Sequence, residues 1–381
     1  MKVIVPFDFY SPAFKAGGPI RSIENIVNLL SGDFDFNILA KNIDLDGAVL
    51  ESVSSDVWYE NPSVIYLDEC KLKGKLNYIR SLIRISKSDD ILYLNSFFSI
   101  RSTLIPLLLI RINILKYSRV ILAPRGELIK DALSSKFFKK KWFIKITNYL
   151  GLYREVVFHS TSDEESISIN NKFKNELVLC ENLPSFRHLG KKVVNNKEKN
   201  ILKCVYSARI HPHKNLFLIL QALNIAKQRG AEISLDVFGL KEDDSYYTKC
   251  NNYIVENELE VIFHGAVDNV ILMDELPKYD LFVLSTLSEN FGHSIAEALS
   301  LGIPVLISNR TPFLNLECYS VGFDLPLDIP LLFAEKMIYF SQLSKEEMQN
   351  YKENSKSYMR NRFNTAELRK SYLNLFKVKH V

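Results

Sequence analysis

The sequence predicts an α/β protein with two Rossmann-like, doubly wound parallel-sheet domains that face a central cleft. Its 381 residues suit two domains of ordinary size, and a hydrophobic fraction of 47% can fill two cores. Short apolar runs alternate with stretches of helical spacing in both halves, as in βαβ units. The polar stretch 186–200 has no periodic apolar face and interrupts this alternation, so it predicts a linker.

The first domain is expected to span residues 1–185. It opens with the apolar run 3–7, and a helical pattern follows over 21–30. Further apolar runs predict strands at 36–40, 64–67, 91–94, 120–123, 156–159 and 177–179. Because these runs lack the polar alternation of a half-exposed sheet, they favour parallel strands covered on both faces.

The second domain is expected to span residues 201–360. Its predicted strands are 203–207, 233–238, 261–263, 281–284 and 305–307. The stretch 331–381 has helical spacing, and we expect residues 361–381 to form a C-terminal helix that packs back on the first domain. Ligands of open parallel sheets lie beyond the carboxyl ends of the strands, so a cleft between the two domains is the expected site.

Cysteine usage and apolar runs limit the cellular setting. The five cysteines are widely spaced without a C-x-x-C pair, which argues against a disulfide framework or a zinc site. The first apolar run is too short for a secretory signal. The longest, 104–115, is interrupted by Arg111 and Asn113 and falls short of the about 20 residues of a membrane span. We expect a cytoplasmic protein, with the inner face of the cell membrane as a candidate location.

Positive charge is concentrated in one part of the chain. Residues 70–145 hold 17 Lys and Arg against 4 Asp and Glu, while the rest of the chain is net acidic. One explanation is a set of solvated helix faces, and the other is attraction of this region to an anionic membrane surface. The lysines and aromatic residues of 136–145 suit docking at a membrane interface, and helix packing is the alternative. No nucleic-acid motif accompanies the charge, so no nucleic-acid partner is expected.

A strand–loop–helix segment carries the main chemical signal. The buried strand 281–285 leads into a loop with Glu289 and Gly292, and a helix follows over 294–301. The free N–H groups of such a helix start can hold anionic or hydroxyl oxygens. Glu289 and Glu297 lie too far apart along the segment to act as an acid/base pair on one bond. We therefore expect them to contact different parts of one ligand.

A second signal follows the first strand of the second domain. Arg209 and Lys214 lie five positions apart on a loop that opens a helix. An arginine can bind two oxygens at once, and a lysine adds a point charge, so the pair suits a diphosphate. A solvated basic loop is the alternative.

The segment from Ser288 to Val305 closely resembles the donor-binding signature of family 4 retaining glycosyltransferases, which have the GT-B fold (glycosyl transferases group 1) and include bacterial surface-polysaccharide enzymes. The resemblance implies that Glu289 faces the donor sugar, that Glu297 binds the nucleotide ribose, and that Arg209 and Lys214 neutralise the leaving diphosphate. Arg209, Lys214 and Glu289 would be catalytic. The implied donor-binding set is Gly17, Gly18, Arg209, Lys214, Glu289, Asn290, Phe291, Gly292, Ser294 and Glu297.

The first domain offers weaker signals. Gly17 and Gly18 follow the first strand, where the family has a glycine-rich loop facing the cleft; a plain turn is the alternative. The stretch Pro124 to Leu128 resembles one in bacterial polysaccharide members, which implies that Arg125 faces the acceptor; pairing with Glu127 or another acid is the alternative. His159 is a further acceptor-side candidate or a structural histidine. The family's usual histidine at a strand end of this domain is absent.

The resemblance implies an enzyme, a hexosyltransferase, that moves a sugar from a nucleotide donor to a hydroxyl with retention of configuration. By family frequency we expect a UDP-sugar donor and, as acceptor, a lipid-linked or growing polysaccharide such as an O-antigen or capsule. A peripheral contact with an anionic membrane is a candidate interaction. The sequence has no metal-ligand spacing, so no cofactor and no essential metal are expected. A nucleotide-sugar epimerase, a glycoside phosphorylase and a non-catalytic nucleotide-sugar binding subunit remain as alternatives.

Overall fold

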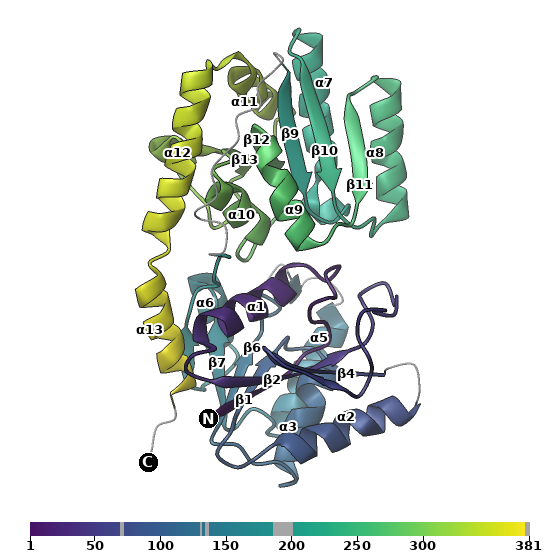
Figure 1. The fold of residues 1–381 in the computed structure, drawn as a ribbon, viewed down its shortest axis with the longest axis vertical. Coiled ribbons are helices and arrows are strands. Elements are labelled where there is room, and N and C mark those ends of the chain that lie inside the picture. Colours follow the sequence, from purple (N-terminus) through teal and green to yellow (C-terminus); the bar gives the residue numbers. More distant parts are fainter. Residues whose placement is uncertain (69–71, 130–131, 134–136, 186–200, 378–381) are drawn as a thin grey trace. The chain divides into compact units, whose positions relative to one another are not determined.

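The computed structural model describes residues 1–381 apart from 69–71, 130–131, 134–136, 186–200 and 378–381. The chain divides into two compact units (Figure 1). Unit 1 comprises Met1–Leu183 and Thr365–Val381, and unit 2 comprises Pro184–Asn364. The predicted linker 186–200 lies outside the described residues.

Unit 1 contains a sheet with the strand order β3-β4-β2-β1-β5-β6-β7-β8 among the described residues. All neighbouring strands pair in parallel except β3 with β4. The strands are β1 Lys2–Pro6, β2 Asp35–Lys41, β3 Trp58–Tyr59, β4 Ser63–Leu67, β5 Ile91–Asn95, β6 Arg119–Ala123, β7 Val156–Ser160 and β8 Leu177–Leu179.

The sheet of unit 1 is doubly wound, because the chain proceeds from β1 toward one edge and then from β5 toward the other. The helices are α1 Gly18–Leu30, α2 Leu72–Ile85, α3 Ile105–Arg111, α5 Phe137–Tyr149, α6 Asp163–Asn170 and α13 Thr365–Phe376. Figure 1 shows α1 on one face of the sheet and α2 and α3 on the other. This arrangement explains why the strand sequences are apolar throughout: both faces are covered.

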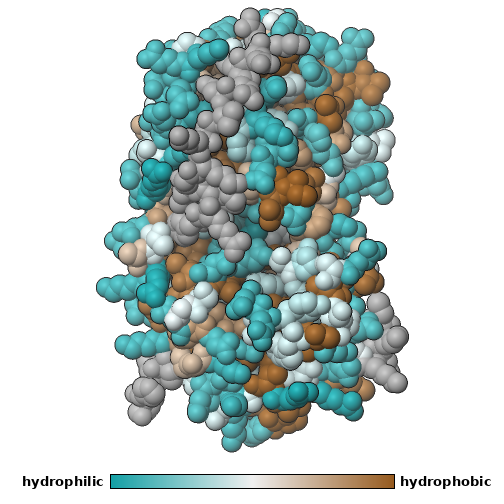
Figure 2. All heavy atoms as spheres, in the orientation of Figure 1, coloured by the Kyte–Doolittle hydropathy of each residue, from teal (hydrophilic) through white to brown (hydrophobic). Residues whose placement is uncertain are grey.

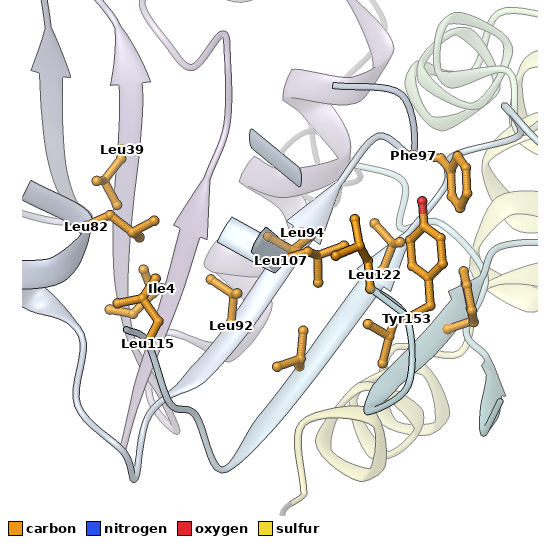
Figure 3. Packing of buried hydrophobic residues seen from close by; sticks show 14 of the residues in the cluster. Ile4, Leu39, Leu82, Leu92, Leu94, Phe97, Leu107, Leu115, Leu122 and Tyr153 are labelled. Atoms are coloured by element: carbon orange, nitrogen blue, oxygen red, sulfur yellow. The ribbon is translucent and has the colours of Figure 1, made fainter. Parts of the chain in front are cut away.

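The core of unit 1 lies between these layers. All five residues of β5 are buried. Ile4 on β1, Leu92 and Leu94 on β5 and Leu122 on β6 belong to one hydrophobic cluster on neighbouring strands (Figure 3). The same strands therefore build the core and present their carboxyl ends at one edge of the sheet.

Unit 2 has the strand order β11-β10-β9-β12-β13-β14 among the described residues, with every pair parallel. Counted along the chain this order is 3-2-1-4-5-6, that of a dinucleotide-binding Rossmann sheet. The strands are β9 Leu202–Ser207, β10 Ile233–Phe238, β11 Val261–Gly265, β12 Leu281–Leu284, β13 Val305–Ser308 and β14 Gly322–Leu325. The two parallel-dominated sheets confirm the predicted fold class.

The helices of unit 2 connect these strands. They are α7 Leu216–Gln228, α8 Asp244–Glu256, α9 Asn269–Glu275, α10 His293–Leu301, α11 Pro330–Gln342 and α12 Lys345–Arg362, with a short 3-10 turn at Pro212–Lys214. α7 packs on α11, and α10 packs on α12. The chain then returns to unit 1, where the ring of Phe376 on α13 lies 5.5 Å from the ring of Phe34 and 5.2 Å from that of Tyr93.

Two strands were not predicted from the sequence. β3 has only two residues, and β14 reads Gly-Phe-Asp-Leu, which lacks an apolar run. Gly322 lets β14 approach β13, because a Cβ atom at this position would lie 1.8 Å from the carbonyl oxygen of Val305. Pairing with a neighbouring strand, rather than local preference, makes this segment a strand.

Among the described residues, no helix has both the length and the apolar character to cross a membrane. The face seen in Figure 2 is mainly hydrophilic, with hydrophobic side chains in small separate groups.

Candidate functional site

The strongest candidate site lies at the centre of the unit 2 sheet. β9 and β12 are neighbours, and the chain winds away from them in opposite directions. The loops after the carboxyl ends of two such strands enclose the usual ligand position of a doubly wound sheet. The loop after β9 carries Arg209 and Lys214, and the loop after β12 carries Glu289. The fold thus brings the two sequence motifs together.

Lys214 and Glu289 are in direct contact. The ammonium Nζ of Lys214 donates to Oε1 of Glu289, and both side chains are largely buried, with 16% and 15% exposed. A charge-assisted hydrogen bond at such a site is stronger than one at the open surface. The cation of one predicted motif and the carboxylate of the other therefore lie in one continuous polar site.

Backbone contacts hold the two loops side by side. The N–H of Leu287 donates to the carbonyl of His213 at 2.9 Å. The hydroxyl of Ser285 donates to the carbonyl of Asn215 at 2.7 Å, and that of Tyr206 to the carbonyl of Lys214 at 3.1 Å. These bonds come from β9 and from the segment after β12, and they hold the backbone of Lys214 and of its two neighbours in place.

His213 lies beside this contact. Its Nε2 is 3.1 Å from Oγ of Ser288. Burial, and secondarily the positive charge of Lys214, lower the pKa of His213 below its ordinary value. His213 is therefore neutral at pH 7, and its ring bridges the two loops rather than adding positive charge.

Arg209 has a partner that the sequence did not indicate. Its Nη1 lies 2.8 Å from Oε1 of Glu242, which follows β10, and the Arg209 side chain is 46% exposed. Gly239 lies beneath the same loop: a Cβ atom there would be 1.9 Å from the carbonyl oxygen of Ala208. Because only glycine fits this approach, Gly239 places the backbone that carries Arg209.

The start of α10 forms the next part of the site. Gly292 precedes the helix with φ 79°, in the left-handed region that favours glycine. Ser294 lies in the first turn, whose N–H groups have no intrahelical partner and can bind anions. The ring of Phe291 is buried and packs 5.8 Å from that of Phe363, so this residue offers its backbone rather than its ring. Asn290 lies half-buried in the same loop.

Glu297 lies in the second turn of α10 and is 3% exposed. Nδ2 of Asn269, the first residue of α9, is 3.4 Å from its Oε1. α9 follows β11, so a third loop at this edge of the sheet reaches the predicted ribose-binding carboxylate. Neither Asn269 nor Glu242 belongs to a motif recognised in the sequence.

In unit 1 the predicted glycine pair lies at the start of α1. Gly17 has φ 69° and precedes the helix, and Gly18 is its first residue. A Cβ atom at Gly17 would meet nothing within 4 Å, so the backbone conformation rather than crowding requires glycine. The carboxylate of Asp44 accepts the N–H of Phe14 at 3.0 Å and that of Lys15 at 3.2 Å, and this holds the preceding loop. The sequence had not singled out Asp44.

Arg125 is the centre of a hydrogen-bond network at the carboxyl ends of β5 and β6. Its Nε donates to Oδ1 of Asn95 at 3.0 Å and its Nη2 to the hydroxyl of Tyr93 at 2.8 Å, while Nη1 donates to Asn182. Its φ of 55° is unusual for a side chain of this size. Among the described residues, no carboxylate forms an ion pair with the Arg125 side chain.

The alternative in which Arg125 pairs with Glu127 is wrong. Glu127 turns away and accepts the hydroxyl of Ser96 at 2.8 Å and the N–H groups of Phe97 and Phe98. Burial raises the pKa of Glu127, and these donors oppose that shift. The Glu127 carboxylate therefore binds the loop after β5 and does not bind the guanidinium of Arg125.

His159 is fully buried, which favours its structural alternative. Its Nδ1 is 2.9 Å from the hydroxyl of Tyr93, and its Nε2 is 2.9 Å from the carbonyl of Cys180. Burial lowers the pKa of His159 to about 3, so the ring is neutral. With no exposed surface it supports Tyr93, and through it Arg125, rather than contacting a ligand itself.

Among the described residues, no group of three or more His, Cys, Asp and Glu side chains could hold a metal ion.

Comparisons with known proteins agree with this geometry. Residues 189–358 match the family model "Glycosyl transferases group 1". The O-antigen biosynthesis glycosyltransferase WclY of Escherichia coli is 28% identical over 123 residues, which is 30% of this chain and only about a third, 35%, of that protein. A sucrose-phosphate synthase from Thermosynechococcus elongatus has a TM-score of 0.72 at 13% identity, over 98% of both chains. Anabaena HepE, solved with UDP and glucose, has a TM-score of 0.68 at 14% identity, over 98% of this chain and 99% of that one. The family match, the curated relative and the shared fold together support a glycosyltransferase enzyme with the GT-B fold.

Proposed function

We propose that this chain is a retaining glycosyltransferase that moves a hexosyl group from a UDP-sugar to a hydroxyl of a lipid-linked or growing bacterial surface polysaccharide. The observation that carries the proposal is the contact of Lys214 with Glu289 at the centre of the unit 2 sheet. It joins a phosphate-binding cation to a sugar-binding carboxylate at the position where such sheets bind nucleotides.

In this proposal unit 2 binds the donor. Arg209 and Lys214 neutralise the diphosphate, most strongly as negative charge develops on the leaving group. A diphosphate replaces Glu289 as the partner of Lys214, which leaves the carboxylate to accept hydrogen bonds from the donor sugar. Ser294 and the start of α10 bind phosphate oxygens, the backbone from Asn290 to Gly292 lines the sugar, and Glu297 accepts the ribose hydroxyls.

Retention is proposed from the resemblance to family 4 enzymes. For that family a same-face route is usually considered, in which the leaving phosphate helps to deprotonate the acceptor. Glu289 and Glu297 are expected to contact different parts of the donor, so they do not form the carboxylate pair of a classical glycosidase, and this favours such a route.

Unit 1 contributes the acceptor side in this proposal. Arg125 holds a charge that no carboxylate of the described residues neutralises, at the edge where β5 and β6 end. Nδ2 of Asn95 is buried and has no hydrogen-bond partner among the described residues. A hydroxyl-rich or phosphorylated acceptor would supply oxygens to both groups. Gly17 and Gly18 would let the acceptor or donor approach the start of α1.

The identity of donor and acceptor rests on relatives. Anabaena HepE was solved with UDP and glucose, and this supports a UDP-sugar. The Escherichia coli relative is named for O-antigen biosynthesis, and this supports a bacterial surface polysaccharide as the acceptor. No metal is needed in the proposed chemistry, because Arg209 and Lys214 supply the positive charge.

A ligand screen tests the proposal. Thermal unfolding of the full chain is measured with UDP, GDP and ADP and their sugars, and UDP ligands should raise the transition temperature most. Release of UDP with EDTA present is then followed with and without an undecaprenyl-linked oligosaccharide acceptor. Acceptor-dependent release supports a metal-independent transferase. Release of an altered nucleotide sugar without acceptor would indicate an epimerase, and binding without turnover a non-catalytic subunit.

A further inference from the structure

We propose that the outer face of α5 in unit 1, together with the residues after α3, docks in the interface of an anionic lipid bilayer. The proposal specifies the surface of the membrane contact expected for the proposed function. It concerns residues separate from the donor site, so it can fail while sugar transfer stands.

The inner face of α5 is an ordinary packing face. The ring of Phe143 lies 6.1 Å from that of Phe97 and 5.4 Å from that of Phe98. Thr147, one turn later, is 3% exposed and accepts the hydroxyl of Tyr153 at 3.1 Å. These contacts attach the helix to the core of unit 1 and fix which side faces outward.

The outer face of α5 carries large apolar side chains that are mostly exposed. Phe138 is 77% exposed, Trp142 60%, Ile146 52% and Tyr149 90%. Spacings of four, four and three residues align these side chains along one side of a helix. Single exposed hydrophobic residues are common, but a continuous row of four, three of them aromatic, indicates an interaction surface.

The apolar row extends to the neighbouring helix end. Nε of Arg111, the last residue of α3, donates to the carbonyl of Leu150 at 3.1 Å. This bond brings the residues after α3 next to the end of α5. Ile112 and Ile114 are 61% and 50% exposed there. The surface is therefore formed by two segments rather than by one helix alone.

Lysines border this row on both sides. Lys139 lies along one border, and Lys141 and Lys145 lie along the other, as expected from 100° per residue. Nζ of Lys145 is 5.3 Å from the centre of the Trp142 ring. The helix contains no acidic residue in its sequence Phe-Phe-Lys-Lys-Lys-Trp-Phe-Ile-Lys-Ile-Thr-Asn-Tyr. Lys140 is different, because it turns inward and donates to the carbonyl of Ala132.

An exposed apolar row bordered by lysines fits an anionic lipid bilayer as its partner. Aromatic rings and isoleucine enter the boundary between headgroups and acyl chains, and bordering lysines reach the lipid phosphates. A second copy of the chain is disfavoured, because a twofold contact would place lysines of like charge against each other. The row lies along a helix that is packed on the sheet, so it would rest in the interface rather than span the membrane.

The test uses full-length protein and vesicles of phosphatidylcholine with or without phosphatidylglycerol. The chain should sediment with the anionic vesicles and much less with neutral ones, and high salt should release it. The variant Phe138→Ser/Trp142→Ser should lower the partition coefficient at least tenfold. The variant Lys139→Gln/Lys141→Gln/Lys145→Gln should lower it by about fivefold for each lysine removed.

Matched controls keep the result specific. Ile167→Ser/Val255→Ser removes side chains that are 62% and 67% exposed outside this surface, and Lys249→Gln/Lys278→Gln/Lys345→Gln removes the same charge from unit 2. Both should bind vesicles like the unchanged chain. In Trp58→Phe, Trp142 is the remaining tryptophan, and its emission should shift to shorter wavelength with anionic vesicles.

Three results would overturn the proposal: equal binding by the α5 variants and the controls, an unshifted Trp142 emission, or a concentration-dependent dimer that only the α5 variants abolish. The last would assign the face to a second copy. UDP-induced thermal stabilisation, measured on every variant, shows whether the donor site is intact and separates this test from that of the transferase function.

Discussion

Lys214 and Glu289 lie 75 positions apart in the sequence, yet the ammonium of one donates directly to the carboxylate of the other. The contact exists because β9 and β12 are neighbours, and each residue lies on the loop that follows one of these strands. It makes the cation and the carboxylate of the proposed donor site interdependent.

Replacing Glu289 by alanine should abolish sugar transfer while the fold persists. Loss of one group that acts on the reacting centre typically costs about 10²–10³-fold in turnover. UDP itself should still bind, because Lys214 loses a competing carboxylate. Acceptor-dependent UDP release and UDP titration measure the two effects. Normal turnover in Glu289→Ala would remove Glu289 from the mechanism, and Glu275→Gln, at an exposed pair with Lys278, is the matched control.

Replacing Glu242 by glutamine should tighten UDP binding. Glu242 now neutralises Arg209, and an exposed pair of this kind is worth about 0–1 kcal/mol, so the gain should be up to about fivefold. Isothermal titration with UDP measures it. Weaker binding would mean that Glu242 positions Arg209 rather than competing for it. Glu335→Gln, which breaks the exposed pair with Arg229 in the same unit, should leave the affinity unchanged.

Replacing Gly239 by alanine should destabilise unit 2 by about 1–3 kcal/mol, because the added methyl overlaps the backbone of Ala208. The shift of that loop should also weaken UDP binding through Arg209. Gly32→Ala is the control, since a Cβ atom there meets nothing within 4 Å. Thermal unfolding of both variants with and without UDP gives the comparison. Equal stability of the two variants would show that the loop after β9 can shift to accommodate the added methyl group at little cost.

Stability should fall with acidification partly because of His159. Burial holds its pKa near 3 in the folded chain, below the ordinary value of 6.5, so the unfolded chain binds the proton more readily. The contribution to stability is complete above pH 6.5 and is lost progressively as the pH falls toward 3. His159→Gln should be less stable at pH 7.5 and should lose less stability between pH 7.5 and 5. Urea unfolding at the two pH values measures this, and an unchanged pH dependence would contradict the assignment.

The strand pattern of the fold was predictable because buried parallel strands are apolar on both faces, as in β5 and β12. The donor loop was predictable for a related reason: Glu289, Gly292 and Glu297 lie on one continuous segment. Strands β3 and β14 could not be predicted from the sequence. They are strands because they pair with a neighbouring strand, and neither contains an apolar run.

The partners of the predicted site residues could not be read from the sequence. Glu242, Asn269 and Gly239 reach the site from loops after other strands, and their roles depend on the spatial order of those strands. The same applies to Arg125, whose nearest acid in sequence, Glu127, turns to the loop after β5 instead. Spacing along the sequence identified residues suited to a ligand. Which other residues contact them depends on the tertiary fold.

The division of the chain has a consequence for its synthesis. Unit 2 is one uninterrupted stretch, whereas unit 1 is completed by α13, which supplies Phe376 to the aromatic group of Phe34, Phe36 and Tyr93. On the ribosome, unit 2 can therefore fold as soon as it emerges. The N-terminal part of unit 1 is translated before unit 2, but its aromatic group is completed only after α13 has been synthesised.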